Sequence, residues 1–298
     1  MSSEDEGEER LGLIAGLSAF SIWGLAPIYF KWLSGVGPDE IIAHRVVWSV
    51  LLLALVLVLR TGRSFPRHVR IDRKTAGLLC LTGGLIALNW LIFVYAVNSD
   101  RVLSTSLGYF INPLMSVLLG LLVFRERLVP VQTLAVLLAA MGTGWLTYRL
   151  GQLPWIAVSL ASTFALYSVI RKLLQVGPMV GLFWETLFVA PWAVAWLLWL
   201  LRSERLVFPA AEPMLMLLLA GTGVLTVAPL LLFAAGVRRL PLSTIGLMQY
   251  LAPSITFLLA VFVYGEPFTM DHAITFGSVW LALVLFFWAA RQRSGPAH

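Results

Sequence analysis

Two charged side chains lie inside long apolar stretches of this sequence, where a charge is costly. Arg45 follows His44 in the segment PDEIIAHRVVWSVLLL (38–53), and Glu185 belongs to the segment WETLFVAP (184–191). A guanidinium stays charged and binds carboxylate or phosphate groups, whereas desolvation of a carboxyl group favours its neutral, protonated form. Both residues are therefore candidates for contacts with a polar solute, and Glu185 is also a candidate carrier of a coupling proton.

The composition places these charges in a membrane. Of the 298 residues, 59% are hydrophobic and only 12% are charged, against about a quarter charged in ordinary soluble domains. Ten apolar runs are each long enough to cross a bilayer as a helix. They are 11–33, 39–60, 74–97, 102–124, 128–148, 153–173, 178–201, 213–236, 242–263 and 269–290. Their continuous apolar character excludes the alternating strands of a membrane barrel, so we expect an all-α transmembrane protein of ten helices without a soluble domain.

Charge in the connections predicts how the chain is oriented. Ten spans put both ends on one side, and cytoplasmic ends place fifteen basic residues, Arg171 and Lys172 among them, inside and five outside. We expect a membrane protein with cytoplasmic tails at 1–10 and 291–298. The acidic start 1–10 is the reverse of a signal peptide, so the first helix is expected to stay attached. The net charge of +6 reads as an orientation signal and an attraction to lipid headgroups, not as a nucleic-acid footprint.

The sequence also repeats itself. LSTSLGYFINP (103–113) recurs as LSTIGLMQYLAP (242–253), and each copy ends thirteen residues before a glutamate, Glu126 or Glu266. The tripeptide VGP occurs at 36–38 and again at 176–178. These matches divide the chain into halves of five helices, 11–148 and 149–290. Because five is odd, homologous halves enter the bilayer from opposite sides, which predicts the inverted repeat typical of secondary transporters with a substrate site near the midplane.

The inverted arrangement separates the two charged residues in depth. Arg45 and Glu185 each lie about seven residues, or ~10 Å, into helices that enter from opposite sides. They should therefore differ by roughly 10 Å in depth in a core of ~30 Å, more than the ~4 Å of an ion pair. We expect Arg45 and Glu185 on opposite walls of one cavity. The alternative is that Arg45 reaches the outer headgroups along its own stem and that Glu185 is protonated and hydrogen-bonded to a neighbouring helix.

Further polar and aromatic side chains fall near the middle of the predicted spans or beside Arg45. They are Trp23, His44, Asn89, Trp90, Tyr109, Asn112, Tyr167, Gln249 and Tyr250. Pro113 and Pro253 lie in equivalent spans, and each leaves a carbonyl group without its helical donor. Two interpretations are open: these side chains bind substrate together with Arg45 and Glu185, or the amides join kinked helices to their neighbours.

Several of these segments resemble a known family. AFSIWGLAPIYFK (19–31), HRVVWS (44–49), GYFINP (108–113) and LSTIGLMQYLAP (242–253) are similar to the RarD-type branch of the EamA, or drug/metabolite, transporter superfamily. The resemblance implies an inner-membrane permease with a central cavity lined by helices 1 to 4 and 6 to 9, and with helices 5 and 10 at the edge. RarD members are linked by name to chloramphenicol sensitivity, which supplies a class of transporter without a defined ligand.

The expected function is transport of a small amphipathic or zwitterionic solute. Metalloprotease, P-loop, nucleophile-elbow and Cys-x-x-Cys motifs are absent, and the single cysteine, Cys80, excludes an intrachain disulfide, so neither cofactor nor metal is expected. Two alternatives stay open: an enzyme acting on a lipid-linked substrate in the membrane, and a passive channel. Glu126 and Glu266 are expected to stabilise the amino termini of the helices that follow them, Lys31 to reach the headgroups, and GLIAG (12–16) to pack closely against another helix. The sequence does not predict the oligomeric state.

Overall fold

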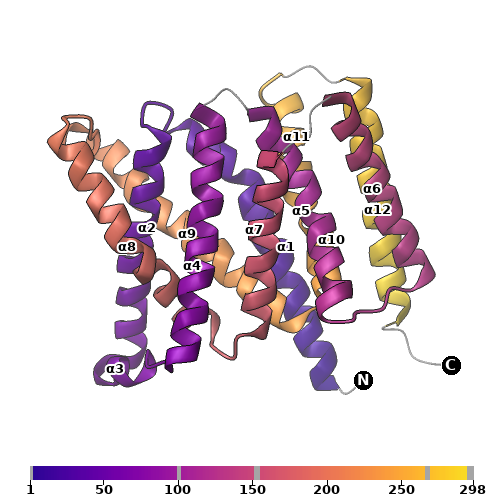
Figure 1. The fold of residues 1–298 in the computed structure, drawn as a ribbon, viewed down its shortest axis with the longest axis horizontal. Helices are drawn as coiled ribbons and strands as arrows, with labels where there is room; N and C mark the ends of the chain where they lie inside the picture. The colour runs from indigo at the N-terminus through magenta and orange to yellow at the C-terminus, as the bar shows by residue number, and fades with distance from the viewer. Residues whose placement is uncertain (1–2, 99–101, 151–154, 266–268, 294–298) are drawn as a thin grey trace.

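The computed structural model describes residues 3–98, 102–150, 155–265 and 269–293, and this part of the chain contains helices and no strand (Figure 1). The first half comprises α1 (Ser3–Lys31), α2 (Pro38–Thr61), α4 (Arg73–Asn98), α5 (Val102–Val123) and α6 (Pro130–Leu150), with η1 (Gly62–Ser64) and α3 (Phe65–His68) between α2 and α4. The second half comprises α7 (Trp155–Leu173), α8 (Pro178–Arg202), η2 (Phe208–Ala210), α9 (Pro213–Arg239), α10 (Leu242–Met248), α11 (Leu251–Phe262) and α12 (Met270–Arg293).

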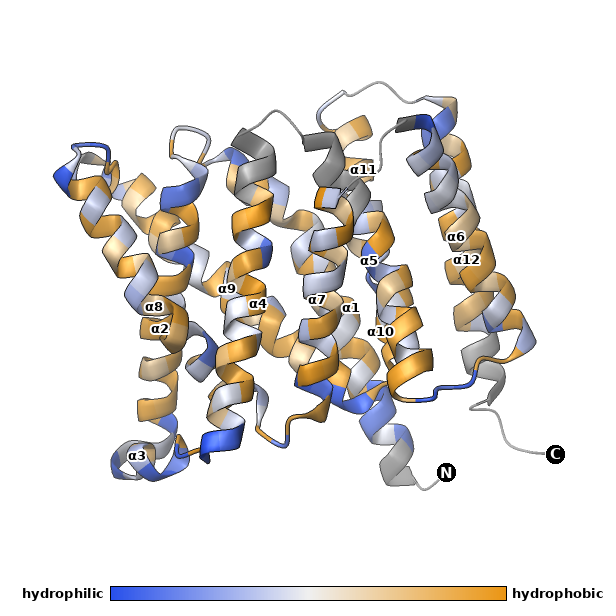
Figure 2. Ribbon diagram, viewed as in Figure 1, coloured by the Kyte–Doolittle hydropathy of each residue, from blue (hydrophilic) through white to orange (hydrophobic). Residues whose placement is uncertain are grey.

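The described helices have the lengths and composition of membrane spans. Nine segments are long and apolar enough to cross a bilayer, one of them formed by α10 and α11 together, and α5 supplies a further apolar stretch, Tyr109–Val123. Hydrophobic residues dominate the middle of the helices, while hydrophilic residues gather at their ends (Figure 2). The prediction of an all-α transmembrane protein of ten helices is confirmed, with nine of the described segments long enough to span a bilayer.

Local sequence determines where the helices begin. Gly37 and Gly177 hold the positions just before α2 and α8, and Pro38 and Pro178 are the first residues of those helices. Proline suits this position because its fixed backbone angle is helical and the N–H that it lacks would have no helical partner there. The repeated VGP motif thus starts equivalent helices in the two halves. Gly62, with φ +52°, follows the last residue of α2.

The packing of the helices has the symmetry of an inverted repeat. Contacts of α1 with α9 have their counterpart between α7 and α4, and contacts of α2 with α9 have theirs between α8 and α4. Three further pairs, α2 with α8, α5 with α10, and α6 with α12, join each helix to its own equivalent. Exchanging the halves therefore reproduces the packing. The main interfaces join one half to the other, so the core lies between the halves. The beginning of α1 and the end of α12 lie on the same side of the molecule (Figure 1).

The two proline-containing segments of the repeat differ in local structure. The helix α5 runs through Pro113 as one element, whereas the predicted span 242–263 is interrupted at Gln249 and Tyr250, between α10 and α11. At the interruption the backbone N–H of Tyr250 donates to the Leu247 carbonyl at 3.1 Å, and that of Ala252 to the Gln249 carbonyl at 3.2 Å. These tighter turns replace the regular helical bonds that Pro253 cannot support.

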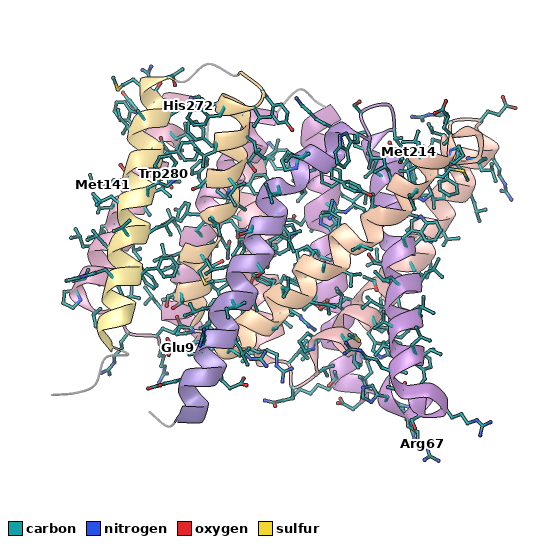
Figure 3. All side chains as sticks on the ribbon, turned by 180° about the vertical axis from the view of Figure 1, so that it is seen from behind. Glu9, Arg67, Met141, Met214, His272 and Trp280 are labelled. Carbon is teal, nitrogen blue, oxygen red and sulfur yellow. The ribbon has the colours of Figure 1, made fainter. Side chains whose placement is uncertain are left out.

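The acidic start of the chain is helical from Ser3 onward, and the cytoplasmic tail expected for 1–10 stays a prediction. Helix α1 begins at Ser3, and Glu8 pairs with Arg239 at the end of α9, with Oε2 2.8 Å from the Arg239 Nε. The predicted close packing of GLIAG is present, because a Cβ at Gly16 would collide with Met248 of α10. Figure 3 shows Glu9 and Arg67 at one end of the molecule and Met214 and His272 at the other.

Glu126 stabilises the amino terminus of a helix, as expected, but that helix is α10 and not the one that follows Glu126 in sequence. Its carboxylate accepts hydrogen bonds from the backbone N–H of Leu242 at 2.6 Å and of Ser243 at 2.8 Å. It therefore stabilises the amino terminus of α10 in the other half instead of the helix that follows it in sequence. Glu266 lies outside the described residues. The exposed Lys31 ammonium lies 3.3 Å from the centre of the Tyr264 ring.

Candidate functional site

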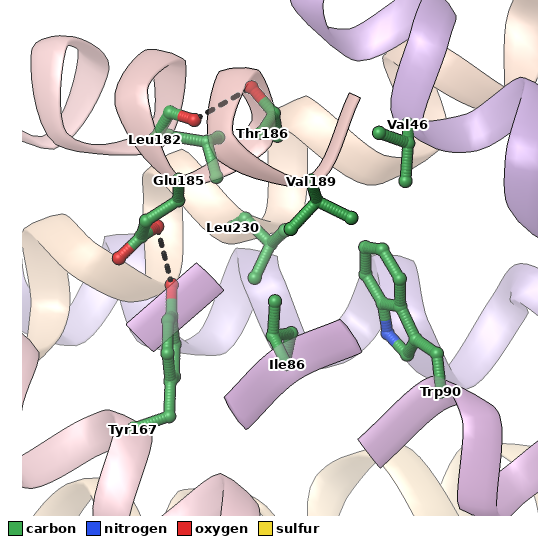
Figure 4. A pocket seen from close by; sticks show the side chains of 9 residues that line it. All are labelled: Val46, Ile86, Trp90, Tyr167, Leu182, Glu185, Thr186, Val189 and Leu230. Carbon is green, nitrogen blue, oxygen red and sulfur yellow. Dashed lines mark hydrogen bonds between the residues drawn. The ribbon is translucent and has the colours of Figure 1, made fainter. Parts of the chain in front are cut away.

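A small pocket is lined by residues of both halves (Figure 4). Its lining consists of residues from α2 and α4 of the first half and from α7, α8 and α9 of the second. They are Val46, Ile86, Trp90, Tyr167, Leu182, Glu185, Thr186, Val189 and Leu230. The pocket has room for about one water molecule, so this conformation is nearly closed at this level. Three of the predicted site residues, Trp90, Tyr167 and Glu185, line it.

Glu185 is the charged residue of this pocket and is only 2% exposed. Its Oε1 accepts a hydrogen bond from the Thr82 hydroxyl of α4 at 2.7 Å, and its Oε2 accepts one from the Tyr167 hydroxyl of α7 at 3.4 Å. The backbones of α4 and α8 approach closely at Gly83, where a Cβ would lie 2.8 Å from the Glu185 carbonyl oxygen. Glu185 thus links three helices from both halves, which agrees with its expected position away from the lipid.

Arg171 is the acid's basic partner. Its Nη1 lies 3.6 Å from Glu185 Oε1, and Arg171 is itself only 2% exposed. The guanidinium rests against Gly181, where any Cβ would collide with it. From the sequence, Arg171 is expected among the basic residues of the connections, because it belongs to the polar end of a span. That assignment is wrong: Arg171 lies one turn after Tyr167 on α7, on the face that packs toward Glu185.

Arg45 lies among aromatic side chains. Its Nε donates to the Thr226 hydroxyl of α9 at 3.0 Å, and its guanidinium carbon lies 4.7 Å from the centre of the Trp90 ring and 5.7 Å from that of Phe30. The Tyr109 hydroxyl is close enough to interact with it electrostatically. These contacts reach α1, α4, α5 and α9, so the side chain points toward neighbouring helices and not along its own helix to the headgroups.

Arg45 and Glu185 do not pair with each other. Ion pairs among the described side chains join Glu185 to Arg171, and Arg45 takes part in none of them. This agrees with the difference in depth expected from the sequence. Trp90 connects the two regions, because its ring contacts the Arg45 guanidinium and also lines the pocket that contains Glu185. Both charged groups therefore lie next to Trp90 or the pocket that it lines. The pocket and the surroundings of Arg45 form the central region of the molecule.

A cluster of aromatic rings borders the pocket through Tyr167. Trp23 of α1 packs against Phe164 and Phe233 with ring centroids 6.0 and 5.7 Å apart, and Tyr167 stacks on Phe233 at 6.2 Å. Trp23 is only partly buried. These ring contacts bring Trp23 of α1 and Tyr167 of α7 into one cluster, although Trp23 does not line the pocket itself.

His44 faces the end of the bundle instead of the pocket. Its Nδ1 accepts a hydrogen bond from the Trp48 indole at 3.2 Å, its Nε2 lies 3.6 Å from Glu40 Oε1, and its ring packs on Phe208 at 4.7 Å. Glu40 in turn accepts bonds from the backbone N–H groups of Val207 and Phe208. These contacts hold η2 against α2, which favours a structural role for His44.

Three of the predicted polar residues join helices to one another. Asn89 donates to the Leu160 carbonyl and the Thr163 hydroxyl of α7, both at 2.8 Å. Tyr250 is completely buried and donates to the Phe110 carbonyl of α5 at 3.1 Å. Gln249 donates to the Ser116 hydroxyl at 2.9 Å. These contacts match the interpretation in which polar side chains join kinked helices.

The remaining two predicted residues both come from α5. Tyr109 is 51% exposed and lies beside Arg45. Asn112 has a buried Oδ1 that lacks a hydrogen-bond partner among the described residues, as does Oε1 of Gln249. Of the eleven predicted residues, the structure gathers Arg45, Trp90, Tyr109, Tyr167 and Glu185 around the central region, with Trp23 at its border.

Two matches to one known family cover nearly the whole chain. Residues 10–148 match the EamA-like transporter family, and residues 153–288 match it again. The chain belongs to the EamA-like transporter family. Two successive matches agree with the repeat seen in the packing, and membership confirms the resemblance found in the sequence. The chain is therefore a multi-pass membrane protein of a transporter family.

Curated relatives of this EamA protein carry transporter or RarD names. An "Uncharacterized transporter" of Vibrio cholerae is 47% identical over 95% of this chain and 93% of its own length. "Protein RarD" of Salmonella typhimurium is 42% identical, covering 95% and 96%. "Chloramphenicol-sensitive protein RarD" of Pseudomonas aeruginosa is 33% identical, covering 93% of each. A solved crystal structure with 18% identity has a TM-score of 0.72 over 94% of this chain and 98% of its own, and so shares its fold.

Two candidate functional residues of the EamA protein, Arg171 and Thr226, were not predicted from the sequence. Arg171 was hidden by its position at the end of a span, and Thr226, which orients Arg45, is one of many hydroxyl residues in apolar helices. A usable signal was the pair of four-residue spacings, Tyr167 to Arg171 on α7 and Gly181 to Glu185 on α8. Each spacing puts two residues on one helix face.

Proposed function

We propose that this protein is an alternating-access secondary transporter of small amphipathic or zwitterionic metabolites or drugs in the inner membrane. The observation that supports this most directly is the position of Trp90, which contacts Arg45 and lines the Glu185 pocket between two inverted halves. A solute at this position would contact both halves. In inverted-repeat transporters such a site stays in place while one half rocks against the other.

The arrangement of α2 and α8 supports this mechanism. These helices are equivalents that pack on each other, and they hold Arg45 and Glu185 respectively. The pocket is nearly closed, so a solute needs relative movement of the helices to enter. Gly83 of α4 packs against the backbone of α8, and Gly223 of α9 packs against the backbone of α2 at Trp48. Smooth glycine contacts of this kind let helices approach closely and shift past one another.

Glu185 is the group best placed to link transport to protons. It is the acid of the pocket, and the polar groups facing it are the Arg171 guanidinium and the Thr82 and Tyr167 hydroxyls. A proton on Glu185 would remove the negative partner of Arg171 and weaken the contact between α7 and α8. The proposed proton link therefore acts through this contact.

The orientation we propose has both termini in the cytoplasm. Arg63, Arg67 and Arg70 lie in or beside η1 and α3, at the end of the bundle that the chain termini approach (Figures 1 and 3). Basic residues in short connections favour the cytoplasmic side, where they also attract anionic headgroups of the bilayer.

The test is uptake and counterflow in proteoliposomes with a panel of amino acids, amines and chloramphenicol-like compounds, with and without an imposed pH gradient. We expect saturable counterflow of at least one solute that is recovered unaltered. Flux that rises linearly with concentration and shows no counterflow would indicate a channel. A chemically altered product would indicate an enzyme, although the pocket offers one carboxyl group, Glu185, among its lining residues.

A further inference from the structure

The charges around the central region are unequal. Among the described side chains it contains Arg45, Arg171 and Glu185, and the 3.6 Å contact between Arg171 and Glu185 commits the acid to Arg171. The nearby acids on α2 have other partners, because Asp39 accepts a bond from the Trp196 indole and Glu40 accepts bonds from the backbone of η2. Arg45 is thus a positive charge without an acidic partner in the described part of the chain.

The contacts of Arg45 fix its orientation and leave its two terminal nitrogens, Nη1 and Nη2, without a described hydrogen bond. Thr226 donates its own hydroxyl hydrogen to the Thr222 carbonyl at 2.8 Å, so its oxygen is free to accept from Arg45 Nε at 3.0 Å. One face of the guanidinium lies against Trp90. The described hydrogen bonds of Arg45 use Nε only, and the side chain is partly exposed. The two terminal nitrogens therefore form a fork that a planar group can approach.

We infer that Arg45 is the carboxylate-binding subsite of the transporter and that the solute is a monoanion with an aromatic or apolar body. This rests on the proposed function and narrows its substrate class. A carboxylate matches the two parallel donors of a guanidinium, and Trp90, Phe30 and Tyr109 supply apolar surface and rings beside it. A zwitterion is disfavoured because its ammonium group would need an acid, and Glu185 is already paired with Arg171. A phosphate monoester is disfavoured because its second charge would be unmatched.

The experiment compares four compounds that share a phenyl group and differ in charge. Purified protein in detergent is titrated at neutral pH with phenylacetate, phenylalanine, phenethylamine and phenylacetamide, and binding is measured by calorimetry and by the thermal unfolding shift. We expect phenylacetate to bind roughly tenfold or more tightly than neutral phenylacetamide, because hydrogen bonds to charged groups are the stronger ones. Phenylalanine and phenethylamine should bind more weakly than phenylacetate.

Variants connect the preference to Arg45. Arg45→Gln should abolish the difference between phenylacetate and phenylacetamide, and Arg45→Lys should retain part of it, because an ammonium keeps the charge and loses the fork. Arg149→Gln is the matched control: Arg149 pairs with Asp271 on an exposed surface, and the preference should persist. If Arg45→Gln does not fold, Arg45→Lys alone must still reduce the preference.

The assignment would be overturned by phenylalanine or phenethylamine binding as tightly as phenylacetate, by a preference that survives in Arg45→Gln, or by absence of binding for all four compounds. These failures differ from failure of the proposed function. A protein that shows saturable counterflow of an amine or a neutral drug would still be a transporter, and only the carboxylate subsite would be wrong.

Discussion

The Arg171 guanidinium of α7 lies 3.6 Å from the Glu185 carboxylate of α8, and both side chains are almost completely buried. The two helices are consecutive, and their connection is short because α7 ends at Leu173 and α8 begins at Pro178. The pair therefore joins α7 and α8, two helices that otherwise pack mainly on other helices, at the wall of the central pocket. Thr82 extends this contact to the first half.

Removing Arg171 should destabilise the protein strongly. Arg171→Leu leaves the Glu185 carboxylate without its counter-charge, and an unpaired buried charge costs about 3–5 kcal/mol. The midpoint of thermal unfolding in detergent should fall, and Arg171→Leu combined with Glu185→Gln should recover part of the loss. The control is Arg149→Leu, whose pair with Asp271 is exposed and should contribute about 0–1 kcal/mol. Equal losses in the two single variants would contradict a stabilising buried pair.

Replacing Glu185 should separate proton coupling from transport. Glu185→Gln keeps the shape of the side chain and cannot release a proton, so accumulation driven by a pH gradient should disappear while counterflow continues. Proteoliposome uptake with and without the gradient measures both. Thr82→Val removes a hydrogen bond to Glu185 and keeps the carboxyl group, so it should retain gradient-driven accumulation. Unchanged gradient dependence in Glu185→Gln would rule out Glu185 as the proton carrier.

Trp90 should be essential for transport because it borders both charged regions. Trp90→Ala removes the ring beneath Arg45 and widens the pocket, so saturable uptake should drop at least about tenfold, consistent with the ~2 kcal/mol of a desolvated cation–π contact. Trp90→Phe keeps a ring and should retain part of the activity. Trp192, which is 78% exposed on α8, provides the control: Trp192→Ala should transport normally. Normal uptake by Trp90→Ala would exclude a central role for this ring.

Two neighbouring glycines offer a sharp comparison of helix packing. A Cβ at Gly83 would lie 2.8 Å from the Glu185 carbonyl oxygen, whereas one at Gly84 meets nothing within 4 Å. Gly83→Ala should therefore force α4 away from α8 and cost about 1–3 kcal/mol, with loss of transport. Gly84→Ala should leave both unchanged or raise stability slightly, since alanine favours the helix. Thermal unfolding and uptake of the two variants, compared side by side, test the contact.

Asp72 should make stability depend on pH in the acidic range. Its carboxylate accepts bonds from the Thr75 N–H at 2.9 Å and the Thr75 hydroxyl at 2.6 Å, and these bonds lower the pKa of Asp72. A lowered pKa in the folded state means that the contribution is complete above about pH 4, the ordinary aspartate value, and is lost as the pH falls through the folded value. Asp72→Ala should be less stable than the parent near neutral pH, and the difference should vanish in strong acid. A pH-independent difference between their unfolding midpoints would contradict this.

The helix architecture could be predicted from the sequence because long apolar runs and repeated motifs can be recognised there without a structure. Long apolar runs gave ten crossing segments, and an odd number of helices per half required inversion. The same reasoning located Arg45 and Glu185, since a charge within an apolar run stands out. Their separation followed from helix length and direction alone.

The partners of these charges could not be predicted in the same way. Arg171 lies where a span ends, and only the rotation of α7 against α8 shows that it points inward instead of toward water. Likewise, Glu126 stabilises α10, which is more than a hundred residues away, because helices of one half pack mainly on helices of the other. Such partners depend on how helices are rotated about their axes, and apolar runs without a polar face do not encode that rotation.

The packing of each half on the other also affects how the protein folds during its synthesis. When a ribosome has completed the first five helices, the main packing partners of α1, α2 and α5 have not yet been synthesised. Glu126 then has no N–H groups of α10 to bind. We therefore expect the amino-terminal portion to stay loosely assembled in the bilayer until the rest is inserted, and the two portions, if produced as separate polypeptides, to depend on each other for survival in the cell.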